Sequence, residues 1–362
     1  MSDSLMKFSK FFEILLCGGN VRVGDIQATP ITNKTNRRKF VKELIDNLLI
    51  LNKTFQKEYG FKIWEKESYL KSGKVFSGSS EHFINLEISD EDYFSKKKST
   101  GDIDIQVSEQ IEKQLHEFFK TNKTFGSMTY IGQSQSAVGQ ISALFDFKEW
   151  GLTPQCDFEF IDIGEDGMPT PFSHWSRSSA WKDIEQGIKG VMHKFVLANL
   201  DHAFTADLLI QKGKKKIVKK ETVHMFAFSV KNGLRPKYRL VDGSSDTWEA
   251  IPAKEGVYTK DIPEIFKILF KKKATVKDLD NFNSFIGIIG MVDKYFDKKQ
   301  QKKVVDAFVE FTVGKKAQKL YRGDPVSDWD MKKAAFDYMD RKLGTNILKQ
   351  YSNEIDDYYN NY

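Results

Sequence analysis

Cysteine is scarce in this chain, which has two, Cys17 and Cys156, among its 362 residues. They provide no zinc-ligand spacing, and a lone pair is a weak argument for a disulfide. A reducing environment and a cytoplasmic location are therefore predicted. The sequence also lacks an apolar run near the ~18 residues that a membrane span requires. Its first residues lack the basic and then apolar pattern of a signal peptide, so no membrane association is expected.

Several common catalytic signatures are missing as well. No Gly-x-x-x-x-Gly-Lys-Ser/Thr loop is present, which argues against a P-loop ATPase. The chain has neither the Gly-x-Ser-x-Gly elbow of a hydrolase nor the Asp-Phe-Gly and His-Arg-Asp motifs of a protein kinase. The chemistry must therefore be sought in a different set of residues.

The composition is that of a folded protein with an uneven charge distribution. Apolar residues make up 40% and aromatic residues 13% of the chain, and 29 residues are phenylalanine, so a substantial core is expected. The net charge is +6, but residues 206–241 hold ten Lys or Arg against two acidic residues, a net +8 that leaves −2 for the rest. Such a local basic region favours a phosphate-bearing partner.

The most informative stretch, residues 75–107, ends in a segment in which acidic and apolar residues alternate. Asp102 and Asp104 occupy one set of positions, and Ile103 and Ile105 occupy the other. Side chains two apart on a strand share a face, so we expect the two carboxylates to lie side by side. Adjacent carboxylates repel each other unless a cation lies between them, and Mg²⁺ prefers oxygen ligands of this kind. The pattern predicts a divalent-metal site.

The same stretch opens with a short apolar strand, a Gly-Ser turn and the start of a helix. The turn consists of Gly78, Ser79 and Ser80. Backbone N–H groups at such a turn, together with the two serine hydroxyls, suit a phosphate group. A phosphate cradle followed by a metal-binding Asp pair indicates phosphoryl or nucleotidyl transfer.

In this order, the apolar strand, Gly-Ser turn, helix and Asp-x-Asp strand resemble the signature of the DNA polymerase β-like nucleotidyltransferase superfamily. The resemblance covers roughly the first half of the chain. It implies two Mg²⁺ (or Mn²⁺) ions and a third carboxylate on a neighbouring strand. We assign that third ligand to Asp157, with Glu159 and Asp146 as alternatives. The sequence departs from the pattern in its long gap between Gly78 and Asp102, where we interpret the polar run 89–100 as a loop insertion.

Two groups of basic residues are candidates for binding the substrates. Arg177, Lys182 and Lys189, around a predicted helix at 181–200, are assigned to the nucleotide, although a solvated basic face would look the same. The second group is interleaved with aromatic residues in predicted strands, which suits a nucleic-acid backbone; a lysine-rich hairpin tip that only protects a sheet edge is the alternative. Its members are Lys214, Lys215, Lys216, Lys219, Lys220, Lys237 and Arg239.

The pattern of apolar residues predicts an α+β fold. Residues 35–59 should form a long amphipathic helix capped by Thr35 or Asn36. A small mixed sheet flanked by helices is expected to follow, with helices at 80–86 and 108–120 and strands at 128–147 and 155–163. Residues 261–362 read as helical throughout. We therefore predict a catalytic domain at 1–255, which includes the basic β-rich region 206–241, and a helical domain at 256–362.

The predicted function is transfer of a nucleoside monophosphate from a nucleoside triphosphate to a hydroxyl acceptor. RNA, for instance tRNA, is the first choice of acceptor because of the basic strands. A protein side chain that receives AMP and a small molecule are the alternatives. A protein of another class, in which the transferase site is inactive and the basic strands bind nucleic acid or support assembly, also fits the sequence.

Overall fold

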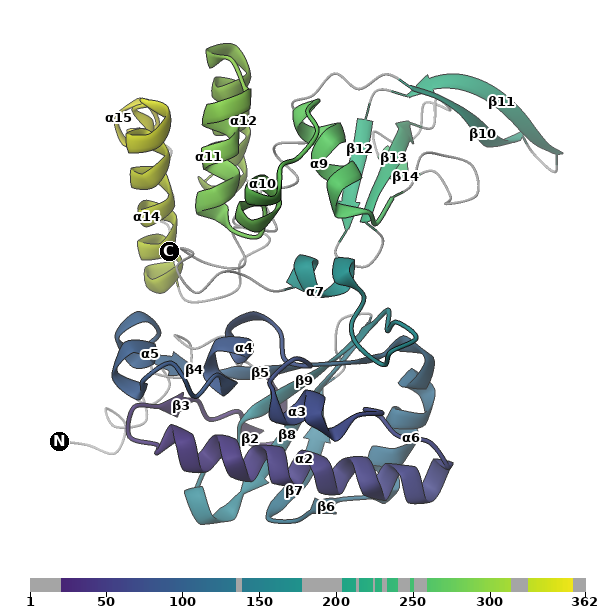
Figure 1. Cartoon of the computed structure of the whole chain (residues 1–362), viewed down its shortest axis with the longest axis vertical. Helices are drawn as coiled ribbons and strands as arrows, with labels where there is room; N and C mark the ends of the chain where they lie inside the picture. The colour runs from purple at the N-terminus through teal and green to yellow at the C-terminus, as the bar shows by residue number, and fades with distance from the viewer. Residues whose placement is uncertain are drawn as a thin grey trace. The chain divides into compact units, whose positions relative to one another are not determined.

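The computed structural model describes residues 21–134, 139–177, 204–212, 215–223, 225–229, 233–239, 248–250, 259–313 and 325–353. The chain divides into two compact units, Met1–Trp181 and Lys182–Tyr362 (Figure 1). The assignment of catalysis to residues 1–255 and of a separate helical domain to 256–362 stays a prediction. The first unit contains all three predicted carboxylate ligands.

A five-stranded mixed sheet forms the centre of the first unit. Its strands lie in the order β5-β9-β8-β7-β6. Their bounds are Asp102–Ser108 for β5, Thr124–Phe125 for β6, Met128–Gln133 for β7, Gln140–Phe147 for β8 and Gln155–Ile161 for β9. Strands β5 and β9 run parallel, and the other neighbours pair antiparallel. The predicted mixed sheet flanked by helices is thus confirmed.

Two helices, α2 (Arg37–Tyr59) and α6 (Glu112–Thr121), pack on one face of this sheet. Phe40 of α2 meets Phe147 of β8 with 5.0 Å between ring centroids, and Phe119 of α6 meets Phe158 of β9 at 5.3 Å. Helix α2 forms where its apolar spacing predicts it, and Asn36 caps it by accepting a hydrogen bond from the backbone N–H of Lys39. The opposite face of the sheet carries the polar residues.

Shorter elements complete the first unit. They are β1 (Arg22–Val23), β2 (Ile26–Gln27), β3 (Ile31–Thr32), α3 (Glu67–Lys71), α4 (Gly78–Ile84), α5 (Asp90–Lys96), β4 (Ser99–Thr100) and α7 (Pro171–Arg177), with 3-10 turns at Glu109–Ile111 and Lys148–Trp150. Strand β4 pairs with β3, so the chain returns to the body of the unit just before β5 begins.

The polar run 89–100 is not a loop, as the sequence suggested, but a short helix with fixed ends. Ser89 caps α5 by accepting a hydrogen bond from the N–H of Asp92, and its hydroxyl donates to the Asp92 carboxylate. The Tyr93 ring is fully buried, and its hydroxyl lies 2.6 Å from that of Thr100. The Ser-x-x-Asp spacing was the sequence signal for this helix. We call residues 89–100 the arm.

The fully buried guanidinium of Arg37 fastens the arm to α2. It donates to the carboxylate of Asp90 at 2.8 Å, to the carbonyl of Phe83 at 2.6 Å and to the carbonyl of Ile88. It also lies over the ring of Tyr93, 5.2 Å from the centroid. One side chain of α2 therefore satisfies several polar groups of the segment that leads into the arm.

We expect Arg37→Met to destabilise the protein by about 3 kcal/mol, because the buried acceptors of the guanidinium lose their donor. Urea unfolding would measure this loss. Arg38→Met is the matched control, since Arg38 is exposed and its guanidinium donates to the carbonyl of Leu86 at 2.8 Å. Equal stability of the two variants would mean that Arg37 does not anchor the arm.

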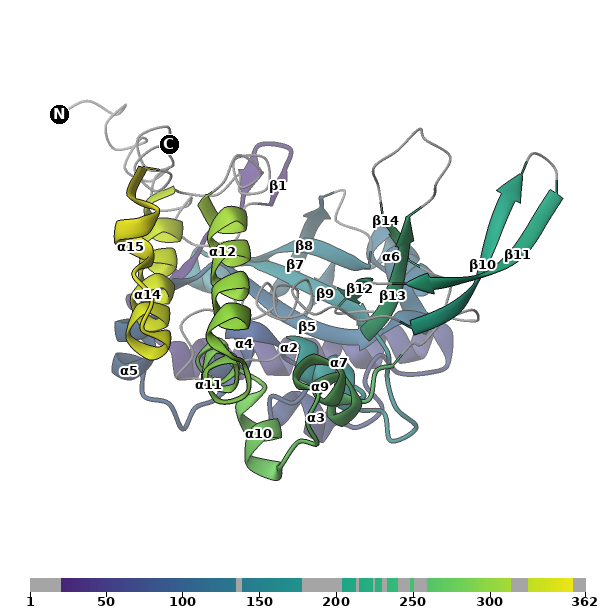
Figure 2. The same cartoon turned by 90° about the horizontal axis from the view of Figure 1, so that it is seen from above.

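The second unit combines strands and helices. Strands β10 (Phe204–Lys212) and β11 (Lys215–Val223) pair as an antiparallel hairpin (Figure 2). Strands β12 (Met225–Ser229), β13 (Gly233–Arg239) and β14 (Trp248–Ala250) form a separate three-stranded sheet. The helices are α9 (Ile262–Phe270), α10 (Val276–Asn281), α11 (Phe285–Tyr295), α12 (Lys298–Val313), α14 (Pro325–Leu343) and α15 (Ile347–Gln350). The predicted helical content of the C-terminal part is confirmed.

The sequence reads as helical throughout this region, but the structure interrupts the helix between α10 and α11. The break follows Asn281, and Ser284 caps α11 by accepting a hydrogen bond from the N–H of Gly287. A Cβ atom at position 287 would lie 1.8 Å from the carbonyl oxygen of Asn281, so only glycine fits this turn.

Among the residues that the structure describes, no helix combines the length and apolarity needed to cross a bilayer.

Candidate metal centre

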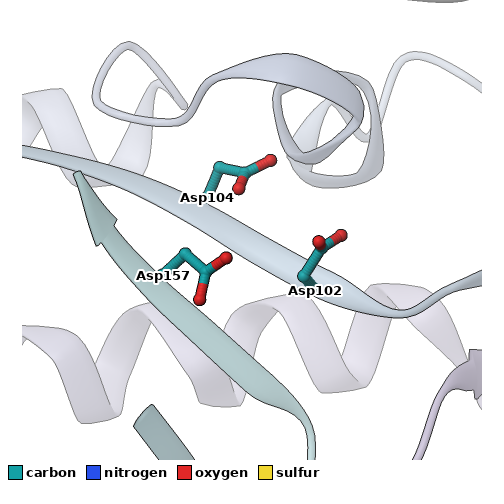
Figure 3. A group of neighbouring side chains, drawn as sticks. All are labelled: Asp102, Asp104 and Asp157. Carbon is teal, nitrogen blue, oxygen red and sulfur yellow. The ribbon is translucent and has the colours of Figure 1, made fainter. Parts of the chain in front are cut away.

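Three carboxylates converge on the polar face of the sheet. Asp102 and Asp104 come from β5, and Asp157 comes from β9, directly opposite Asp104 in the parallel register. Ile103 and Ile105, which alternate with the Asp pair, are fully buried on the other face. The side chains of the three Asp residues lie on the same side of the two strands (Figure 3). Each offers an oxygen within 4.8 Å of the other two.

The two alternative third ligands lie in different surroundings. Both oxygens of Glu159 are engaged: one accepts a hydrogen bond from the Ser77 hydroxyl at 2.7 Å, and the other forms an ion pair with Arg177. Asp146 lies on β8, where it pairs with Thr129 of β7. It follows Ser142, the β8 residue that pairs with Asp157, by four residues. At about 3.3 Å per residue this places it roughly 13 Å along the strand. The structure therefore groups Asp157, and not Glu159 or Asp146, with the pair.

Gln155 holds the Asp157 carboxylate in position. Its side-chain Nε2 lies 2.9 and 3.0 Å from the two carboxylate oxygens, and its Oε1 accepts a hydrogen bond from the backbone N–H of Val21. Because the amide is itself fixed at its oxygen, it limits rotation of the carboxylate. Gln155 is thus a positioning residue for Asp157.

The carboxylates disfavour one another's ionised forms. Burial, and then the charges of Asp102, Glu159 and Asp157, raise the pKa of Asp104 well above its ordinary 3.8. Burial, with a further contribution from Asp102, raises the pKa of Asp157 to about 6, although hydrogen bonds from Ser142 and Gln155 act in the opposite direction. Burial also raises the pKa of Asp102, which Lys97 partly offsets. The cluster therefore holds more negative charge than its protein partners compensate.

This donor set fits a hard divalent cation. Carboxylate oxygens are the ligands that Mg²⁺ and Mn²⁺ prefer, and a cation among them would offset the burial that raises the pKa of all three carboxyls and the mutual repulsion that adds to it at Asp104 and Asp157. The buried Cys156, whose thiol pKa is raised by burial, lies on the apolar face between Gln155 and Asp157 and is not placed to act as a soft ligand. The cluster could bind a metal ion through oxygen alone.

We expect Gln155→Leu to weaken Mn²⁺ binding by about tenfold or more, the usual cost of removing a partner that orients a metal ligand. The freed Asp157 carboxylate would also hold its proton more tightly. Titration of Mn²⁺, followed by the electron paramagnetic resonance of the free ion, measures the affinity. Gln110→Leu changes an exposed glutamine and serves as control. Unchanged affinity in the Gln155 variant would exclude the positioning role.

The Gly-Ser turn lies against β5, beside the carboxylates. Ser77 donates its backbone N–H to the carbonyl of Asp104, and Gly78 has φ of +61°, which favours glycine. The hydroxyl oxygen of Ser80 accepts the N–H of Asp104 at 2.8 Å. Ser80 thus ties α4 to β5, and it is buried, whereas Ser79 is partly exposed. Of the three residues predicted to grip phosphate, Ser79 has the accessible side chain.

Lys97, which directly follows α5 in the arm, is a neighbour of the site that the sequence analysis missed. Its Nζ donates to the hydroxyl of Ser79 at 2.5 Å, and its charge lowers the pKa of both Asp102 and Asp104. The signal in the sequence was the run of three lysines, 96–98, a few residues before Asp102. It was hidden because the run was interpreted as part of a loop insertion.

The other predicted binding residues are placed only in part. Arg177, at the end of α7, pairs with Glu159 and through it is linked to Ser77. Lys182, Lys189 and Lys214 lie outside the described residues. Strand β11 carries Lys215, Lys216, Lys219 and Lys220, and β13 carries Lys237 and Arg239. Their assignment to nucleotide and nucleic acid stays a prediction.

No family model, curated protein or solved structure matches this chain. The functional argument therefore depends on the geometry and chemistry of the carboxylate cluster and its neighbours.

Proposed function

We propose that this protein is a divalent-metal-dependent nucleotidyltransferase. The observation that carries the proposal is the convergence of Asp102, Asp104 and Asp157 beside the Gly-Ser turn. A carboxylate cluster alone is compatible with many proteins, but here a partly exposed hydroxyl and a lysine ammonium lie next to it. Oxygen ligands for a cation and donors for a phosphate are thus adjacent, which is what a metal–triphosphate substrate requires.

The three carboxylates would hold two Mg²⁺ or Mn²⁺ ions, which would offset charge on the triphosphate and lower the pKa of the acceptor hydroxyl. In the reaction, the acceptor oxygen forms a bond to the α-phosphorus, and the bond between that phosphorus and the bridging oxygen to the β-phosphate breaks. The acceptor proton goes to solvent, and pyrophosphate leaves. Because this chemistry depends on alignment and charge compensation, the chain needs no separate side-chain base.

RNA is the proposed acceptor. The support comes from residues 206–241, whose net +8 is concentrated in β11, β13 and the segments next to them. A small-molecule acceptor would not require this charge, whereas an RNA backbone would. A protein hydroxyl, a small molecule, or nucleic-acid binding without catalysis are the other outcomes of the test below.

The test is incubation with each α-³²P-labelled nucleoside triphosphate, Mn²⁺ and total RNA, with the Asp102→Asn/Asp104→Asn double variant alongside. We expect label in RNA with the wild type and none with the double variant. Label in protein instead would move the acceptor to a side chain. If neither protein transfers label while both bind RNA with a steep salt dependence, the binding-protein alternative replaces the enzyme.

A further inference from the structure

We propose that Lys97 is a phosphate-binding residue of this site, which together with Ser79 contacts the β- and γ-phosphates of the nucleoside triphosphate. This inference rests on the proposed function and deepens it. It assigns a role to the arm, residues 89–100, which lengthens the segment between the Gly-Ser turn and the Asp pair.

The first support is the position of the ammonium group. It lies 2.5 Å from the hydroxyl of Ser79. Ser79 is the residue of the Gly-Ser turn whose side chain is accessible. The charge of Lys97 also lowers the pKa of both Asp102 and Asp104, so the ammonium lies near these carboxylates as well as beside the turn. A phosphate bound to the metal at the carboxylates and to Ser79 would therefore meet this ammonium.

The second support is the way the arm is built. Lys97 follows α5, and its backbone N–H donates to the carbonyl of Tyr93 at 2.9 Å. The buried Tyr93 is fixed by Thr100, and the start of α5 is fixed by Arg37 through Asp90. A lysine that only solubilises the surface does not require anchors on both sides. Here the anchors determine where the base of the Lys97 side chain lies, and the residue as a whole is partly exposed.

Charge compensation by itself is the competing explanation. Lys97 could serve only to offset the negative charge of Asp102 and Asp104. The two roles predict different results when the charge is removed. A counter-ion competes with a cation, so its loss would tighten Mn²⁺ binding and leave polyphosphate binding unchanged. A phosphate ligand adds a charge-assisted hydrogen bond to the polyphosphate, so its loss would weaken polyphosphate binding.

The experiment uses the full chain and two probes: Mn²⁺ alone, and Mn²⁺–tripolyphosphate, which has no base or sugar and isolates the phosphate contact. Isothermal titration calorimetry would compare wild type, Lys97→Met and Lys97→Arg with Lys98→Met. Lys98 is the exposed neighbour in the same arm and loses the same charge. We expect Lys97→Met to bind Mn²⁺–tripolyphosphate at least about tenfold more weakly, Lys97→Arg to retain most of the affinity, and Lys98→Met to resemble the wild type.

Two results would overturn the inference. One is equal tripolyphosphate affinity in Lys97→Met and wild type, and the other is an equal loss in Lys97→Met and Lys98→Met. Absence of tripolyphosphate binding by the wild type would count in the same way. An Asp104→Asn sample distinguishes these failures from that of the proposed function, because it reports on the metal. If it binds Mn²⁺ like the wild type, the carboxylate site itself is refuted.

Discussion

Replacing Asp104 with asparagine is expected to abolish nucleotidyl transfer and, at the same time, to raise the melting temperature of the metal-free protein. Transfer should fall about a thousandfold or more, because a ligand that places charge opposite the reacting phosphate is lost. Stability should rise because Asp104 is held near three other acidic groups, and burial and their charges raise its pKa. An amide of the same shape removes that repulsion.

The combination of results distinguishes a functional carboxylate from a structural one. A structural aspartate that is replaced loses favourable contacts, so the protein melts earlier. Thermal unfolding in a chelator and transfer assays in Mn²⁺ would measure both properties on the same sample. Asp146→Asn, on the polar face of the same sheet but away from the cluster, should leave both unchanged. A variant of Asp104 that melts earlier, or one that keeps its activity, contradicts the assignment.

Relative to Asp157→Asn, the metal-free wild type is expected to lose stability as the pH rises from 4 to 7.5. Burial raises the pKa of Asp157 from 3.8 to about 6, so the folded state holds this proton more tightly than the unfolded state. The stability that the protonated Asp157 contributes is therefore fully present below the pKa of the unfolded state, 3.8, and is lost as the pH rises through the pKa of the folded state, about 6. A shift of this size corresponds to about 3 kcal/mol in total, of which about 2 kcal/mol develops over this range.

Urea unfolding of both proteins at several pH values in a chelator would measure this change. As the pH rises, the free energy of unfolding of Asp157→Asn should increase relative to that of the wild type. Saturating Mn²⁺ at pH 7.5 should then stabilise the wild type and leave the variant unaffected, because only the wild type has the complete ligand set. A constant difference across the pH range would show that Asp157 is not held in its protonated form.

The main features of the fold could be predicted from local patterns. The apolar spacing and a cap at Thr35 or Asn36 predict α2, and the alternation of Asp and Ile predicts which face of β5 carries the carboxylates. These signals depend on neighbours in sequence. The helix in the arm was missed although Ser89 and Asp92 mark its start, because the polar run resembled a loop. The break after Asn281 depends on the close approach of Gly287, which apolar periodicity does not reveal.

The site could be predicted less completely, for a physical reason. Asp102 and Asp104 are neighbours on one strand, so their proximity follows from the chain itself. The choice of Asp157 over Glu159 depends on strand register and on the contacts of Glu159 with Ser77 and Arg177, which only the folded chain brings together. The contact of Lys97 with Ser79 likewise depends on how the arm folds back.

The measurement that tests the metal centre most directly is an anomalous difference map from crystals of the wild type grown with Mn²⁺. We predict a peak, or two, among the carboxylates of Asp102, Asp104 and Asp157, and no peak there in crystals of Asp104→Asn. Mn²⁺ bound elsewhere on the protein, with the carboxylates vacant and hydrogen bonded only to protein groups, would contradict the account.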